Sequence, residues 1–239
     1  MQDQSTGADQ HLVVARGLGM RGVRGRAYQG VDLDLAGGQA HAICAENKGG
    51  KTELLLTLAG RMLATEGSLS IAGVNARHLR GLDKVRPLAG LGFFERVNDV
   101  ERFLRVRTVV SAELSLAGRP SGRAATEEYL SRWGLADHAA TVIDDLERRD
   151  FDLLGIVLGM VGDPRILVVG DIERDLTEHQ SHALADRLCD LARREGTCVI
   201  CGVNDYDLAA RFDTAYCLTD DARAQCAAWE RKGLEREVA

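Results

Sequence analysis

The sequence predicts an α/β domain built on a mainly parallel sheet, with an antiparallel β side sheet and a helical subdomain. Short β-like segments open the chain, and residues 31–35 alternate apolar and acidic side chains, as a half-buried strand does. In the second half, apolar strand-like runs alternate with helix-like segments, an order that predicts parallel strands joined by crossover helices. Between these two parts, residues from about 98 to 150 become charged and mostly helical.

Turn signals separate the elements that we expect along the chain. Gly37 and Gly38 form a turn before an apolar strand, and Gly60 follows a helix-like run. Around the helical stretch, the expected strands are 12–15, 31–35, 40–44, 68–72, 166–169, 198–201 and 215–218, and the expected helices are 52–59, 151–160 and 178–195.

The length of 239 residues fits one large domain with a small insert. We expect a disordered tail over 1–10, one main domain over 11–220 with its helical subdomain at about 98–150, and a helical tail over 221–239. The first ten residues are polar and show no signal-peptide pattern, and no apolar run approaches the ~20 residues of a membrane span. We therefore expect a cytoplasmic protein that could dock peripherally at the inner face of a membrane.

Composition excludes some classes of function. An apolar content of 45% with only 3 prolines supports a sizeable core, and a net charge of −6 argues against a general nucleic-acid partner. Cys198 and Cys201 form a CxxC, which favours a metal or redox site, but they fall in a strand-like run. Positions three apart on a strand face opposite sides of a sheet, so we expect neither a metal site nor a redox site at these cysteines.

The segment 45–52 lies between an expected strand and an expected helix, which is the context of a phosphate-binding P-loop. Backbone N–H groups would surround phosphate oxygens, Lys51 would reach the β and γ phosphates, and Thr52 would hold Mg²⁺. Two of the chain's four lysines lie here, at Lys48 and Lys51. The candidate nucleotide-binding residues are Ala45, Asn47, Lys48, Gly49, Gly50, Lys51, Thr52 and Glu53.

The loop departs from the P-loop pattern at two positions. Ala45 replaces its first glycine, and Lys48 stands where a glycine is usual. A left-handed backbone at Lys48 would cost about 1–2 kcal/mol. An added charge-assisted phosphate contact could return about 1.5–3 kcal/mol, so ATP binding could survive.

A second glycine motif, Gly17 to Gly22, fits the dinucleotide fingerprint G-x-G-x-x-G and suggests an oxidoreductase. That fold requires a helix after the glycines, whereas residues 23–30 show no helical periodicity. We therefore set the dinucleotide hypothesis aside.

Over residues 12–220 the chain resembles the ATP-binding-cassette (ABC) ATPases. The resemblance rests on the order of several segments: 31–35 before the P-loop, 54–60 after it, 66–68 with 71–73, and 161–169, which is similar to the run into the Walker B strand. It implies a P-loop NTPase core, an antiparallel side sheet, and a helical subdomain that meets an integral membrane partner. It also implies a dimer of cassette subunits, either a homodimer or a heterodimer.

The resemblance also assigns catalytic positions, and most of them carry unusual residues. Glu95 stands where the family has the glutamine that links the core to the helical subdomain and touches Mg²⁺. Residues 147–150 occupy the signature loop, and Thr177 takes the place of the D-loop aspartate. Asn204 replaces the switch histidine.

At the Walker B end, the Mg²⁺-ordering aspartate falls on Gly170 and the catalytic glutamate on Asp171. A one-residue slip would instead make Asp171 the Mg²⁺ partner and Glu173 the base. Glu173 and Asp175 are equally compatible with a solvated acidic turn. The resemblance thus implies Asp171, Glu95 and Asn204 as catalytic residues, and Thr52 and Asp171 as metal ligands.

We therefore expect an ATP-binding subunit of an ABC-type system that binds MgATP, hydrolyses it weakly or only with a partner, and couples to a membrane protein. The alternative is a non-enzymatic regulatory or scaffold subunit that binds nucleotide without turnover. The cofactors implied are ATP and Mg²⁺. Phosphoryl transfer depends on positioned charges, so replacing several positioning groups together should slow it by orders of magnitude.

Overall fold

The computed structural model describes residues 11–22, 25–45, 50–94, 97–218 and 228–230, the last three by their backbone alone. Within these residues, the main sheet has the strand order β10-β9-β3-β8-β7-β6. The strands are β3 (Ala40–Ala45), β6 (Ala89–Leu91), β7 (Ile166–Asp171), β8 (Cys198–Val203), β9 (Thr214–Leu218) and β10 (Ala228–Glu230). All are parallel except β10, which pairs antiparallel with β9 at the edge.

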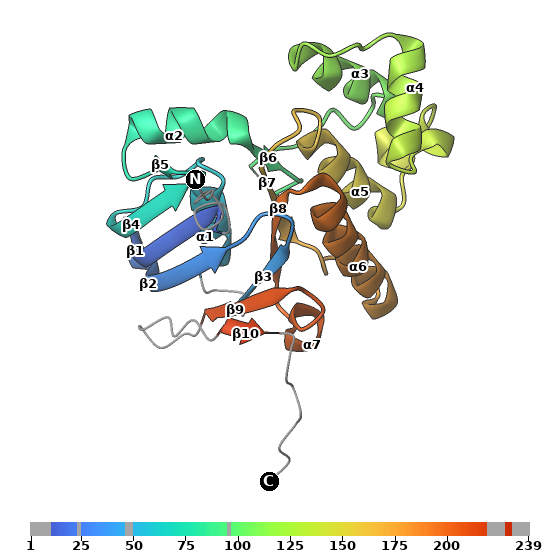
Figure 1. Ribbon diagram of the computed structural model, residues 1–239. Helices are drawn as coiled ribbons and strands as arrows, with labels where there is room; N and C mark the ends of the chain where they lie inside the picture. The colour runs from blue at the N-terminus through green and yellow to red at the C-terminus, as the bar shows by residue number, and fades with distance from the viewer. Residues whose placement is uncertain (1–10, 23–24, 46–49, 95–96, 219–227, 231–239) are drawn as a thin grey trace, which may run out of the picture.

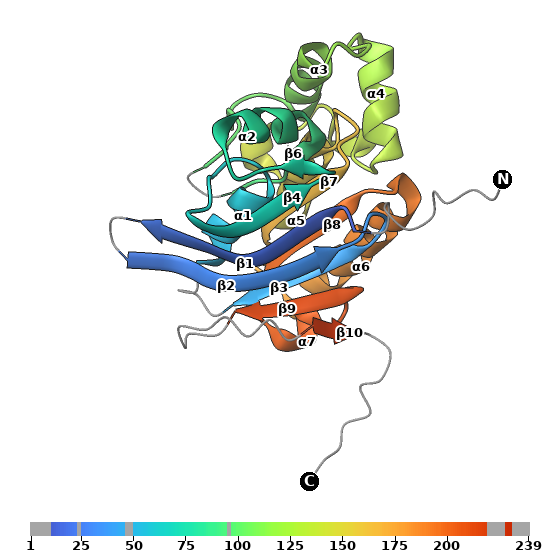
Figure 2. The same cartoon turned by 60° about the vertical axis from the view of Figure 1, so that its left-hand side comes forward.

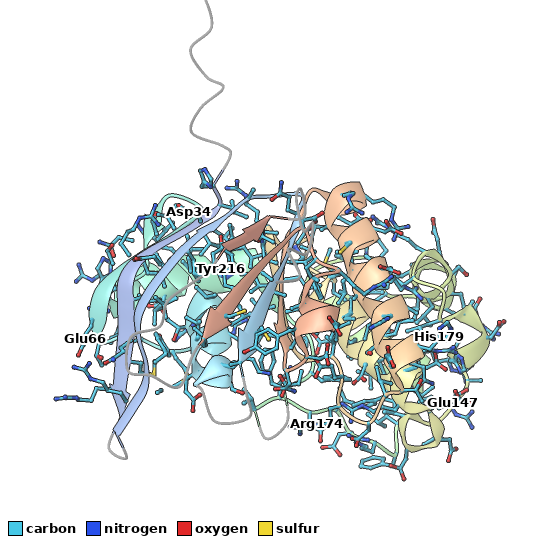
Figure 3. The ribbon with its side chains drawn as sticks, turned by 90° about the horizontal axis from the view of Figure 1, so that it is seen from below. Asp34, Glu66, Glu147, Arg174, His179 and Tyr216 are labelled. Atoms are coloured by element: carbon cyan, nitrogen blue, oxygen red, sulfur yellow. The ribbon has the colours of Figure 1, made fainter. Side chains whose placement is uncertain are left out.

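A second, antiparallel sheet covers one side of the domain (Figure 1). Its strands are β1 (Val13–Gly22), β2 (Gly25–Leu35), β4 (Glu66–Ile71) and β5 (Val74–Asn75), in the order β2-β1-β4-β5. Val31, Leu33 and Leu35 of β2 are buried while the aspartates between them are exposed, so the predicted alternation is confirmed. The Tyr216 hydroxyl on β9 donates to the Asp34 carbonyl on β2 at 2.9 Å and joins the two sheets (Figure 3).

Helices lie on both faces of the main sheet. Helix α1 (Lys51–Leu58) lies between the two sheets, whereas α5 (Arg148–Gly159) and α6 (Glu178–Glu195) cover the other face (Figure 1). Helices α3 (Val106–Leu116) and α4 (Arg123–Arg132) stand at one end, away from the strands (Figure 2). The remaining helical elements are α2 (Leu79–Val85), α7 (Tyr206–Ala209) and the 3₁₀ turns Arg86–Leu88, Ala136–His138 and Ile143–Asp145.

Two apolar clusters, one on each face of the main sheet, form the core. Alternate residues of one strand enter different clusters, because successive side chains of a strand point to opposite faces. Cys201 packs with the helices α3 to α6, and Cys198 packs with α1 and the side sheet. The two thiols of the CxxC therefore face opposite sides of the sheet, as expected.

The expected fold class is confirmed, with local differences. Strand β1 runs through Gly22 and is followed by β2, so no helix opens after the second glycine motif. Helix α2 and strand β6 were not expected, since α2 is short and contains an interior glycine, which weakens helical periodicity. Helix α6 spans the residues that its periodicity predicts.

The segment 221–239 was expected to be helical, and this is wrong for its described residues, which form β10. Strand β9 would otherwise leave a row of unpaired backbone groups at the sheet edge, and β10 pairs with them. The other proposed domain boundaries stay predictions. None of the helices in the described part of the chain is long and apolar enough to cross a bilayer.

Candidate functional site

Three parallel strands end at one edge of the main sheet and bring the candidate residues together. Cys44 near the end of β3 lies opposite Val203 at the end of β8, and Asp171 at the end of β7 lies opposite Gly202. Helix α1 begins at Lys51, six residues after β3 ends at Ala45. Ligands of open α/β sheets bind outside the carboxyl ends of the strands, which is where these residues meet.

Gly50 sets the start of α1. Its φ of 68° is left-handed, and a Cβ at this position would lie 1.8 Å from the Ala27 carbonyl oxygen of β2, so a side chain does not fit. The helix is fixed to the same strand by the Tyr28 hydroxyl, which lies 2.8 Å from Thr57 Oγ1. Burial raises the pKa of Tyr28 to about 12, so this hydroxyl stays protonated. Helix α1 is therefore packed against β2 at both of its ends, at Gly50 and at Thr57.

Lys51 is the charge at the centre of the site. Its ammonium lies 2.6 Å from Asp171 Oδ1, and it donates to the Val203 carbonyl at 2.8 Å and to Asn204 Oδ1 at 2.5 Å. The Lys51 side chain is 7% exposed and that of Asp171 is 21% exposed. A buried ammonium needs such partners, because an unpaired buried charge is strongly unfavourable. The structure thus brings together three residues that the sequence singled out: Lys51, Asp171 and Asn204.

Strand β7 carries an irregularity at Gly170. Val169 pairs with Cys201 and Asp171 pairs with Gly202, so Gly170 is skipped in the register with β8. This is the geometry of a bulge, in which an extra residue re-aims the side chain that follows. Asp171 thereby pairs with Lys51, and both assignments of the Walker B residues stay predictions.

Glu173 holds the segment that follows β8. Its Oε1 accepts hydrogen bonds from the backbone N–H groups of Asn204 at 2.8 Å and Asp205 at 2.9 Å. The carboxylate is thereby committed to backbone donors, which favours a positioning role. Asp175, by contrast, is exposed and lies 3.4 Å from the Arg148 guanidinium.

The thiol of Cys44 contacts the same segment at Asn204. Cys44 Sγ lies 3.7 Å from the Asn204 carbonyl oxygen, at sulfur hydrogen-bond distance. Hydrogen bonding with Cys217 and burial raise the pKa of Cys44 well above its ordinary value. Cys44 is therefore a neutral donor, and Asn204 is held through its N–H, its side chain and its carbonyl.

A cavity of about 120 Å³ opens beside Lys51. Thr52 and Asp171 form one side of it, and Phe93 and Phe94 add an apolar wall next to Gly170. Arg148 and Arg174 also line it. No sequence pattern marked Arg174 as a site residue. The family resemblance placed Arg148 in the signature loop.

The other predicted residues fall in different places. Asn47, Lys48, Gly49 and Glu95 lie outside the described residues, so their assigned roles stay predictions. Ala45 ends β3, and Glu53 lies in the first turn of α1. Two positions that the family resemblance assigned to function serve helix ends here: Glu147 precedes α5 as its N-cap, and Thr177 caps α6 in a capping box with Gln180.

Thr52 and Asp171 are the described residues that could hold Mg²⁺ beside a nucleotide, and this role stays a prediction. The ion takes near-octahedral oxygen ligands, usually one or two carboxylates with substrate phosphates and waters. Thr52 offers a hydroxyl, Gly170 offers no side chain, and the Asp171 carboxylate already pairs with Lys51. Among the described residues, no group of three or more His, Cys, Asp or Glu side chains could hold a metal ion.

The sequence of this chain is similar to those of several known proteins. No protein-family profile matches the chain. It is 26% identical to the methionine import ATP-binding protein MetN of Caulobacter vibrioides over 204 residues, which cover 82% of this chain and 60% of the relative. It is 27% identical to the phosphonates import ATP-binding protein PhnC 2 of Synechococcus sp., over 78% of this chain and 73% of the relative.

The chain spans less than two thirds of the MetN relative. It also spans only 38% of a putative ribose/galactose/methyl galactoside import ATP-binding protein of Burkholderia cenocepacia, with 26% identity over 81% of this chain.

Solved structures agree on the fold. The cbiO1 protein of Clostridium perfringens, described as part of the ABC transporter complex cbiONQ, superposes with a TM-score of 0.80 at 17% identity, over 93% of this chain and 90% of that one. The ATP-binding cassette MJ0796, a dimer bound to ADP and Pi, superposes with a TM-score of 0.76 at 19% identity, over 92% and 99%.

Proposed function

We propose that this chain, which has the ABC cassette ATPase fold and is similar to ABC import ATP-binding proteins, is the ATP-binding subunit of an ABC-type import system. The observation that carries the proposal is the position of Lys51. Its ammonium lies at the N-terminus of α1 and is held by three oxygen acceptors at the carboxyl edge of the sheet. Phosphate oxygens are acceptors of the same kind, and a helix N-terminus favours their charge.

We propose that hydrolysis by this subunit is slow or partner-dependent. Asp171 is paired with Lys51, and Glu173 is hydrogen-bonded to the backbone of Asn204 and Asp205. Gly170 supplies no carboxylate. Each group that could orient an attacking water is thus engaged within the described protein, and phosphoryl transfer depends on such positioning. The same contacts favour the second candidate, a regulatory subunit that binds nucleotide without turnover.

Association with an integral membrane partner and pairing with a second cassette subunit belong to this proposal. The relatives are named as import ATP-binding proteins, and MJ0796 is described as dimeric. The helical part of this chain carries exposed apolar side chains, with Phe103 72% exposed and Leu116 81% exposed. These two side chains are the candidates for contact with such a partner.

A titration of a fluorescent ATP analogue against the purified chain tests the proposal. Lys51→Ala should weaken binding at least about tenfold, since a charge-assisted phosphate contact is lost. Lys84→Ala is the matched control, because Lys84 is an exposed lysine in the last turn of α2, and its affinity should stay within about twofold of wild type. A thermal melt of each variant separates lost binding from lost folding. Equal affinities for wild type and Lys51→Ala in folded protein would remove this site from the proposal.

A further inference from the structure

Within the described part of the chain, the Lys51 ammonium has as many acceptors as it has N–H donors. An ammonium group carries three N–H donors and accepts no hydrogen bond. Its three acceptors are Asp171 Oδ1 at 2.6 Å, the Val203 carbonyl oxygen at 2.8 Å and Asn204 Oδ1 at 2.5 Å. A phosphate oxygen that binds this ammonium must therefore displace one of the three.

Two of these acceptors belong to side chains that can rotate away. The Val203 carbonyl belongs to the last residue of β8, and Val203 is fully buried. A buried carbonyl without a donor is unfavourable, so we expect Lys51 to keep this contact. The side chain of Asp171 is 21% exposed and Asn204 is half-buried, so both can turn toward solvent.

Asp171 is the stronger of the two side-chain acceptors. Its carboxylate is an anion, as a phosphate is, and charge-assisted hydrogen bonds are about twice as strong as neutral ones. Salt screens this ion pair less than a surface pair, since the Lys51 side chain is only 7% exposed. The pair therefore reproduces, inside the free protein, the contact that a phosphate would make with Lys51.

Asn204 is fixed as an acceptor by contacts of its own backbone. Its N–H donates to Glu173 Oε1 at 2.8 Å, and its carbonyl oxygen lies 3.7 Å from Cys44 Sγ. Because this backbone is already held, little further conformational entropy is lost when the side chain accepts from Lys51. Asn204 is uncharged, so removing its side chain releases one N–H donor of Lys51 without changing the charge of the site.

We propose that Asp171 and Asn204 are internal competitors of phosphate for Lys51, so that the free chain holds its phosphate-binding lysine in an autoinhibited state. This inference rests on the proposed ATP-binding function and names a regulation of the same site. Only the fraction of molecules in which a competitor has left Lys51 is ready to bind, and the apparent affinity for ATP is lowered by that fraction. Any event that draws either side chain away from Lys51 raises the affinity.

Calorimetric titration of the full chain with ATP tests the inference. In EDTA, where no metal ion contributes, Asp171→Asn should raise the affinity at least about fivefold, because a neutral amide holds an ammonium less strongly than a carboxylate does. Asn204→Ala should raise the affinity at least about threefold, as expected for the loss of one competing neutral hydrogen bond. The gain of Asn204→Ala should appear in excess Mg²⁺ as well as in EDTA, because Asn204 is not a candidate metal ligand.

Asp175→Asn is the matched control for charge. Asp175 lies four residues beyond Asp171, is exposed, and pairs with Arg148 at 3.4 Å. Its substitution removes the same charge from the same segment without removing an acceptor of Lys51, so the ATP affinity should stay within about twofold of wild type. Asn204→Ala gives a second separation, since simple repulsion between Asp171 and ATP predicts no change for a neutral substitution.

Thermal melts establish which variants are folded. If Asp171→Asn fails to fold, Asn204→Ala must still bind ATP more tightly than wild type, because it keeps the ion pair. Two outcomes would overturn the inference: a folded Asn204→Ala or Asp171→Asn that binds ATP no more tightly than wild type, or an equal gain for Asp175→Asn and Asp171→Asn. Absence of ATP binding by wild type and by every variant, in EDTA and in Mg²⁺, would remove the proposed function itself and the inference with it.

Discussion

Glu173 and Asn204 are joined across the ends of two neighbouring strands: Glu173 Oε1 accepts the backbone N–H of Asn204 at 2.8 Å. The side chain of the same Asn204 accepts a hydrogen bond from Lys51 at 2.5 Å. A carboxylate after β7 therefore positions, through the loop after β8, an acceptor for the lysine at the start of α1. Three separate segments of the chain depend on one another at this point.

This relationship predicts the effect of removing Glu173. Glu173→Ala leaves one part-buried and one exposed N–H group without their acceptor and should lower the free energy of unfolding by about 1–2 kcal/mol. Glu173→Gln keeps a neutral acceptor and should cost about half as much. Urea denaturation measures both. Glu127→Ala is the control, since Glu127 forms an exposed i,i+4 pair with Arg123 and should change stability by less than about 0.5 kcal/mol. A cost for Glu173→Ala no larger than that of the control would contradict the positioning role.

Gly50 predicts a steric requirement at the start of α1. Gly50→Ala places a Cβ against the Ala27 carbonyl in a backbone with φ of 68°. Gly73→Ala has a similar φ of 77° with nothing within 4 Å of the added atom, so it should cost only the left-handed strain of about 1–2 kcal/mol. Gly50→Ala should cost at least about 2 kcal/mol more, measured by urea denaturation. Similar losses for the two variants would show that β2 moves aside without difficulty.

His41 predicts a pH dependence of stability. The ring is fully buried, with Nδ1 2.7 Å from Thr214 Oγ1 and Nε2 3.0 Å from the Ala36 carbonyl. A neutral ring satisfies both contacts, accepting at Nδ1 and donating from Nε2. Burial is the main cause that lowers the pKa of His41 below its ordinary value of 6.5, while the Ala36 carbonyl and Asp213 oppose the shift.

The sign follows from proton binding. Above pH of about 6.5, histidine is neutral in both states and its contribution to stability is complete. Below that pH the unfolded chain takes up a proton that the folded chain resists, so stability falls as the pH falls. The stability gap between wild type and His41→Gln should therefore narrow from pH 7.5 to pH 5.5 in urea denaturation. A gap that stays constant with pH would exclude this role for His41.

The catalytic hypothesis predicts slow turnover that substitution can raise. Wild-type phosphate release at saturating MgATP should lie far below the enzyme median of ~10 s⁻¹. Gly170→Asp, Asp171→Glu and Asn204→His together restore the family's residues and should raise turnover at least about tenfold. A Cβ at Gly170 would lie 3.2 Å from the Phe93 carbonyl oxygen, which is tight, so Gly170→Ala serves as the control for space. A wild-type rate already near the median would mean that the residues present perform the chemistry.

Local sequence patterns determined many of the elements and their order, although not α2, β6 or β10. The alternation over 31–35 specified a half-buried strand, and the periodicity over 178–195 specified a long helix, because each pattern depends only on neighbouring residues. The glycine-rich segment before Lys51 indicated a loop between strand and helix, and the structure has β3 and α1 on either side. These signals were enough for the fold class.

Only the tertiary structure decided which residues meet at the site. Lys51 and Asn204 are 153 residues apart, and their contact exists because the sheet order places β3 beside β8 and β8 beside β7. The skipped residue at Gly170 and the convergence of Arg148 and Arg174 on one cavity depend equally on strand register and helix packing. A single sequence holds no local pattern that predicts such contacts between distant segments. The pairing of distant strands depends on packing across the whole sheet.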